Sequence, residues 1–237
     1  IIIIIIFEKL KDAKIEVVKG VLSEEAKFVN RVFLKNLTKN LPYVVLKTAT
    51  TMDGKIATKT GSSKWITSVE SRQYVREIRQ KFDCIITTSN TVIADNPSMI
   101  HKTKCVLDRT HITDLDYKIY KQGKVYIASA EDFDYPYLIK TPVNDSKLDI
   151  LYLLQELYKK GICNVLIEAG GTLAGSVLKE KLVDEIYQFI SPKILNDNEG
   201  LSCFNGNKCI DISECVDLEI YETKKLNSDI LVKAIVK

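Results

Sequence analysis

Short apolar, β-branched runs alternate with segments of helical periodicity through most of this chain. Such runs are typical of buried strands, and apolar residues at every third or fourth position are typical of amphipathic helices. The predicted strands are 43–46, 84–88, 105–107, 125–128 and 162–167. The predicted helices are 23–40, 68–82, 148–160 and 172–181, with a polar loop at 89–97. Toward the end the pattern changes, and β segments are predicted at 185–190, 215–223 and 230–236.

Alternating βα units followed by a β-rich end predict an α/β fold. We expect a central, mostly parallel sheet with antiparallel edge strands and flanking helices. The 237 residues are enough to bury a sizeable core. A content of 46% hydrophobic and 27% charged residues is ordinary for a soluble globular protein.

The charge and the cysteine and histidine content exclude several function classes. A net charge of +3 is too small to indicate a nucleic-acid partner and suits anionic small molecules. The only histidines, His101 and His111, lie far from any cysteine cluster with metal-ligand spacing, so no metal site is predicted. The six cysteines include no C-x-x-C pair, which favours reduced thiols in a cytosolic protein.

The chain begins with six isoleucines, Ile1 to Ile6. Six apolar residues cannot cross a bilayer, which takes about 20, and no basic segment of a signal peptide is present. We therefore expect no membrane partner. The interpretation we favour is a buried strand exposed by truncation.

A polar loop with one large aromatic residue follows the first strand of the main domain. The sequence from 42 to 67 reads PYVVLKTATTMDGKIATKTGSSKWIT, with a turn at Asp53-Gly54 and the only tryptophan at Trp65. Binding sites favour loops carried on a rigid scaffold, so this stretch predicts the mouth of a ligand site. Trp65 could instead be a core aromatic residue.

A second candidate site lies where the strand at 162–167 meets the following helix. The strand ends at Glu168, Gly170-Gly171 follows, and the helix begins at Thr172. Glycines let the backbone approach an anion, and the start of a helix attracts phosphate. The pattern is neither G-x-G-x-x-G nor a Walker loop, so a tight structural turn is an equal alternative.

Arg72, Arg76 and Arg79 share one face of the predicted helix at 68–82. For Arg72 and Arg76 we favour a solvated basic face. Asp95 precedes Asn96-Pro97 and could belong to a site or simply stabilise a turn.

Several fixed-spacing elements together resemble the reductase domain of the bacterial bifunctional riboflavin-biosynthesis deaminase/reductase. They are Lys47-Thr48-Ala49, MDGKIA at 52–57, SKWIT at 63–67, TVIADNP at 91–97 and EAGGTLAG at 168–175. The resemblance implies a dihydrofolate-reductase-like three-layer sandwich, NADPH as cofactor, a cytoplasmic location and a homodimer. The implied reaction reduces 5-amino-6-(5-phosphoribosylamino)uracil, a phosphorylated pyrimidine, to 5-amino-6-(5-phosphoribitylamino)uracil.

The resemblance also implies a domain organisation. Residues 7–33 resemble the linker of the bifunctional proteins, so residues 1–40 are expected to be a remnant of the deaminase tail with a linker helix. Residues 41–237 are then the reductase domain. The H-x-E and P-C-x-x-C motifs of a zinc deaminase are missing from this sequence.

Residue roles carry over by the same resemblance. The implied cofactor contacts are Ala49, Trp65, Thr91, Asp95, Arg109, Gly170, Gly171, Thr172, Leu173, Ala174, Gly175 and Ser176. The implied substrate contacts are Ser63, Arg79, Met99, Lys102 and Glu168. An arginine at position 109 could hold a 2′-phosphate and so favour NADPH over NADH.

The sequence departs from the family pattern after Pro97. Met99 stands where leucine is usual, and Lys102 stands where arginine is usual. Lysine keeps the charge but lacks the bidentate fork, and Lys104 could substitute if the shortened loop shifts register. Lys47 and Asp95 are the polar candidates for moving a proton, although Lys47 could equally be a strand residue that reaches the sheet edge.

Two alternative functions remain open at this point. One is a dihydrofolate-reductase-like oxidoreductase that acts on another pterin or pyrimidine. The other is a non-catalytic nucleotide-binding module.

Overall fold

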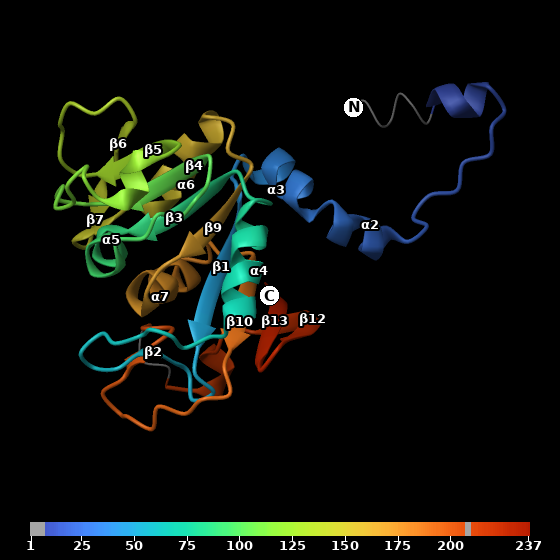
Figure 1. Ribbon diagram of the computed structural model, residues 1–237. Coiled ribbons are helices and arrows are strands. Elements are labelled where there is room, and N and C mark those ends of the chain that lie inside the picture. The colour runs from blue at the N-terminus through green and yellow to red at the C-terminus, as the bar shows by residue number, and fades with distance from the viewer. Residues whose placement is uncertain (1–7, 207–209) are drawn as a thin grey trace.

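A nine-stranded sheet forms the centre of the computed structural model, which describes residues 8–206 and 210–237. Its order is β12-β13-β10-β1-β9-β3-β4-β5-β6 (Figure 1). The strands are β1 (Tyr43–Thr50), β3 (Cys84–Thr88), β4 (Thr103–Leu107), β5 (Lys124–Ser129), β6 (Leu138–Lys140), β9 (Asn164–Glu168), β10 (Glu185–Ile190), β12 (Leu218–Leu226) and β13 (Asp229–Val236). The predicted strand at Ile1–Ile6 lies outside the described residues.

The strands from β10 to β6 run parallel, whereas β13 pairs antiparallel with β10 and β12 antiparallel with β13. The predicted parallel sheet with antiparallel edge strands is therefore confirmed. Small two-stranded pairs join β2 (Lys55–Ala57) to β11 (Leu201–Ser202) and β7 (Val143–Asn144) to β8 (Lys147–Leu148).

Helices cover both faces of the sheet. The helices are α2 (Ser23–Val29), α3 (Arg31–Lys39), α4 (Val69–Arg79), α5 (Ser89–Asp95), α6 (Ile150–Lys159) and α7 (Gly171–Lys179), with 3-10 turns η1 (Lys118–Lys121) and η2 (Ile212–Glu214), and all but α2 lie near the sheet. Alternate residues of β1 point to opposite faces. Val44 and Leu46 pack in the core formed with α6 and α7, and Tyr43 and Val45 pack in the core formed with α4 and α5. Two cores around one sheet make the predicted three-layer arrangement.

Two predicted elements differ from the structure. The segment predicted as a polar loop at 89–97 contains α5, because the Thr88 hydroxyl accepts a hydrogen bond from the Thr91 amide at 3.3 Å and Val92 is fully buried. This cap and burial outweigh the polar composition. The single helix predicted from residue 23 to 40 is interrupted at Asn30, which separates α2 from α3.

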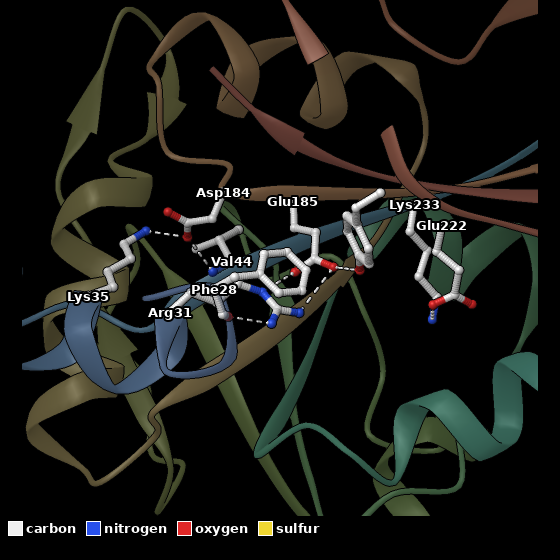
Figure 2. A network of polar contacts seen from close by, with 9 residues as sticks. Phe28, Arg31, Lys35, Val44, Asp184, Glu185, Glu222 and Lys233 are labelled. Carbon is white, nitrogen blue, oxygen red and sulfur yellow. Dashed lines mark hydrogen bonds and ion pairs between the residues drawn. The ribbon is translucent and has the colours of Figure 1, made fainter. Parts of the chain in front are cut away.

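Ion pairs connect α3 to the start of β10 (Figure 2). Arg31 Nε lies 3.2 Å from Glu185 Oε2, and Lys35 pairs with Asp184. The Tyr221 hydroxyl also donates to Glu185. By contrast, α2 buries no residue, and Figure 1 shows it extending away from the sheet. The ion pairs that join this N-terminal segment to the sheet therefore come from α3, and Phe28 of α2 contacts Tyr221 of β12 with ring centroids 5.0 Å apart.

Replacing Arg31 with methionine is expected to lower the free energy of unfolding by about 3 kcal/mol, because the Glu185 side chain is only 1% exposed and would lose its countercharge. Urea denaturation measures the change. The matched control is Lys27→Met, which removes an exposed pair with Glu24 and should change stability by less than about 1 kcal/mol. Equal losses in the two variants would contradict the prediction.

The five described cysteines, Cys84, Cys105, Cys163, Cys203 and Cys215, are free thiols. Cys209 lies outside the described residues. In the part of the chain that the structure describes, no helix has the length and apolar character needed to span a membrane.

Candidate functional site

A cavity of about 940 Å³ opens at the carboxyl ends of β1, β3, β4 and β9, between α4, α5 and the start of α7. Ligands of open α/β sheets bind at this end of parallel strands. The predicted site residues that line it are Lys47, Ala49, Ser63, Trp65, Arg79, Thr91, Asp95, Met99, Arg109, Glu168, Gly170, Thr172, Leu173 and Ser176. The structure therefore brings together residues from distant parts of the chain.

A buried charge cluster forms one wall of the cavity. Lys47 of β1 and Glu168 of β9 are direct neighbours in the parallel register, so both reach the same side of the sheet. Arg79, the last residue of α4, binds Glu168 through both carboxylate oxygens, with Nε at 2.6 Å from Oε1 and Nη2 at 2.9 Å from Oε2. Lys47 Nζ lies 3.8 Å from Glu168 Oε2.

The electrostatics of this cluster set its protonation. Burial acts to raise the pKa of Glu168, but the charge and hydrogen bonds of Arg79 and then the charge of Lys47 outweigh it, so the pKa lies below its ordinary value. For Lys47, burial is the largest influence and lowers the pKa, against the attraction of Glu168. The cluster thus holds a carboxylate beside a lysine that releases its proton more readily than usual.

Trp65 stands at the mouth of the cavity and is not a core residue, since 61% of it is exposed. The Arg72 guanidinium lies 4.3 Å from the ring centroid and donates to the Thr67 carbonyl at 2.6 Å. Lys193 donates to the Trp65 carbonyl at 2.6 Å. A cation over the ring and a hydrogen bond to its backbone hold the loop in place.

Asp95 faces the same mouth from the end of α5. Its Oδ1 lies 3.1 Å from Lys64 Nζ, and both side chains are about half exposed. This pair links the loop of Trp65 to α5. Asp95 therefore has a position in the cavity wall as well as one beside the turn before Pro97.

Lys102, predicted as a substrate contact, is exposed and does not line the cavity. The neighbouring His101 is buried, with Nε2 3.0 Å from the Phe82 carbonyl and Nδ1 2.6 Å from the Thr103 carbonyl. Lys102, next in the chain, is exposed. Lys104 cannot substitute, since it is fully buried and donates to the carbonyls of Ile119 and Gln122.

Only part of the glycine-rich element, which was predicted to line the cofactor diphosphate, borders the cavity. Gly171, Ala174 and Gly175 do not line it. A Cβ atom at Gly171 would lie 2.2 Å from the Ser202 carbonyl oxygen, and one at Gly175 would lie 2.1 Å from that of Asn205. These two glycines are therefore required for close packing against the 202–205 segment. At the first turn of α7, Gly171 can still offer its backbone amide to a ligand.

The start of α7 suits an anionic group. Gly170 is the N-cap and has no side chain to accept from the first-turn amides, and it borders the cavity. Lys147, on the short hairpin of β7 and β8, reaches the same region, with Nζ 3.4 Å from Ser176 Oγ. The free amides, the helix dipole and the lysine together fit the diphosphate of a dinucleotide. The buried Thr48 hydroxyl, which has no partner among the described residues, also borders the cavity.

Four cationic residues that line the cavity were not predicted as site residues, namely Lys64, Arg72, Arg76 and Lys147. Arg72 and Arg76, expected to be a solvated basic face, both line the cavity with Arg79. Their shared helix face was visible in the sequence, but the partner surface was not. Lys147 gave no sequence signal, because the pairing of β7 with β8 places it. Within residues 8–206 and 210–237 no cluster of His, Cys, Asp and Glu side chains could hold a metal ion.

Comparison with known proteins yields one family. The model of the RibD C-terminal domain matches residues 42–232. The riboflavin biosynthesis protein RibD of Haemophilus influenzae is 32% identical over 241 residues, which cover 92% of this chain. The chain spans 64% of the length of that relative.

Solved structures show the same fold. The deaminase/5-amino-6-(5-phosphoribosylamino)uracil reductase of Thermotoga maritima superposes with a TM-score of 0.81 at 29% identity, covering 98% of this chain and 67% of that one. The riboflavin biosynthesis reductase Rib7 of Saccharomyces cerevisiae has a TM-score of 0.67 at 20% identity, covering 88% and 99%. The predicted dihydrofolate-reductase-like fold is confirmed by these likenesses.

Proposed function

This chain belongs to the RibD C-terminal domain family, and on that premise we propose that it is an NADPH-dependent reductase. The proposed reaction converts 5-amino-6-(5-phosphoribosylamino)uracil to 5-amino-6-(5-phosphoribitylamino)uracil in riboflavin biosynthesis. One observation carries the proposal. Ala49 at the end of β1 and the start of α7 line the same cavity, with the Lys47–Glu168–Arg79 cluster beside them.

The residues present fit the two ligands of such a reaction. The first-turn amides of α7 with Lys147 would hold the cofactor diphosphate, and Trp65 and Thr91 would border the rest of the cofactor. When bound, NADPH supplies the hydride chemistry. A volume of about 940 Å³ is at the upper end of the usual range for ligand pockets, which suits a site for two ligands.

The chain's own residues would position the substrate and supply a proton. We assign Lys47 the role of proton donor, because it lies in the cavity and burial lowers its pKa. Glu168 keeps Lys47 charged and orients Arg79, whose Nη1 is left to reach a ligand. Asp95 is a second candidate for proton movement, but its exposed pair with Lys64 favours a role in closing the mouth.

The purified chain is tested by following NADPH absorbance with and without the phosphoribosylaminouracil. Oxidation that depends on this substrate supports the proposal. Turnover of a pterin instead would identify another dihydrofolate-reductase-like oxidoreductase. Binding of NADPH, seen as quenching of its fluorescence, without turnover of any substrate would indicate a nucleotide-binding module.

Arg109 is proposed to favour NADPH over NADH. It follows β4, is exposed and lines the cavity, so its guanidinium is available to a 2′-phosphate. Replacing Arg109 with alanine should raise KM for NADPH about 10- to 100-fold and leave KM for NADH within about twofold, since charged hydrogen bonds contribute about 1.5–3 kcal/mol. Steady-state kinetics with both cofactors checks this, and equal effects would refute the assignment.

We also propose that residues 41–237 form the reductase domain and that residues 1–40 correspond to a deaminase tail with a linker helix. The absence of buried residues in α2 supports the separation of this segment, whereas the ion pairs of α3 connect it to the sheet. A cytoplasmic location and a homodimer are further proposals. Exposed Leu218 and Ile220 on the outermost strand β12 favour association of two copies.

A further inference from the structure

Arg76 is an unpaired cation in the cavity. It lies on α4 between Arg72 and Arg79, its residue is exposed, and it lines the cavity. In residues 8–206 and 210–237 the structure gives it no hydrogen bond and no ion pair, whereas both of its arginine neighbours are engaged. A guanidinium that has no protein partner and faces a cavity is available to an anionic ligand.

The other cations on this side of the cavity are already occupied. Arg79 donates hydrogen bonds from Nε and Nη2 to Glu168. Arg72 donates to a backbone carbonyl, and its guanidinium lies over the Trp65 ring. Lys64 pairs with Asp95. Lys102 lies outside the cavity. Among these cations, Arg76 is therefore the one that lines the cavity without a partner in the described part of the chain.

The local charge balance is also positive. Lys47, Lys64, Arg72, Arg76 and Arg79 line the cavity on this side, against the two carboxylates of Glu168 and Asp95. An excess of this kind in a concave site attracts an anion. A phosphate monoester carries up to two negative charges and accepts the parallel hydrogen bonds that a guanidinium offers.

We propose that Arg76 binds the phosphate of the phosphoribosyl substrate. The inference rests on the proposed function for the identity of that substrate. Arg76 is three residues before Arg79 and so is its neighbour on the surface of α4. The phosphate would then lie along α4, away from Arg109 and the start of α7, where the cofactor phosphates are assigned.

The test compares Arg76→Ala with the parent chain on two substrates. KM for the phosphorylated substrate should rise about 10- to 100-fold, while KM for the dephosphorylated riboside and for NADPH should stay within about twofold. Arg76→Lys should recover part of the loss, because charge returns without the fork. The matched control Lys102→Ala, which removes a cation outside the cavity, should change none of these constants by more than about twofold.

Calorimetry with ribose 5-phosphate provides a second readout that needs no turnover. The parent chain and Lys102→Ala should bind it, and Arg76→Ala should bind it about 10- to 100-fold more weakly. Equal weakening on both substrates, or a larger effect in Lys102→Ala, would overturn the inference. If the parent chain binds ribose 5-phosphate through Arg76 but turns over no phosphoribosylaminouracil, the proposed reaction fails while the phosphate site stands.

Discussion

Replacing Lys47 with methionine is expected to lower kcat by about 100- to 1,000-fold, because positioned proton donors contribute this much. Methionine keeps most of the side-chain volume and removes the ammonium group. Lys47 Nζ lies 3.8 Å from Glu168 Oε2, and 16% of the side chain is exposed, so it can reach a ligand in the cavity. KM for NADPH should change less than kcat, because the cofactor diphosphate is assigned to the first-turn amides of α7 and to Lys147 and not to Lys47.

The same prediction has a pH signature. A donor must be protonated, so kcat should fall as pH rises through the pKa of Lys47, which burial lowers below its ordinary value. The alkaline limb of the kcat profile reports that group. Lys225→Met, on the exposed part of β12, is the control and should retain the parent profile. An unchanged kcat in Lys47→Met would show that Lys47 is not the proton donor.

Replacing Glu168 with glutamine is expected to lower kcat/KM by about 100-fold, or about 2.7 kcal/mol. The amide cannot accept both hydrogen bonds from Arg79, so Arg79 and Lys47 are left without their countercharge. Stability should also fall by about 3 kcal/mol, because a buried ion pair loses one partner. Kinetics and urea denaturation measure the two effects on one preparation.

A shift in the alkaline limb of the kcat pH profile distinguishes the effect of Glu168 on the pKa of Lys47 from a general loss of folded structure. Glu168 raises the pKa of Lys47, whereas Arg79 lowers it. Without the carboxylate the pKa of Lys47 should drop further, so the limb should move to lower pH. Glu199→Gln, which breaks an exposed pair with Lys59, should leave the limb in place. A limb that does not move in Glu168→Gln would contradict the proposed coupling.

Much of the fold could be predicted because its signals are local. The strand cores at 43–46, 84–88 and 185–190 are short β-branched runs, and all lie within the observed strands. Boundaries were less accurate where exposed residues carry no periodicity. The segment predicted at 215–223 is β12 at Leu218–Leu226, an edge strand that is mostly exposed.

The α/β class, the parallel sheet with its antiparallel edge and the family motifs could be predicted, since these depend on residue type and short-range spacing. Which charged side chains share the cavity depends on how distant segments pack against one another. Arg76 faces it and Lys102 does not, because the packing of α4 and the inward turn of His101 depend on contacts between segments far apart in the chain. Such contacts cannot be predicted from the residue pattern of any one segment.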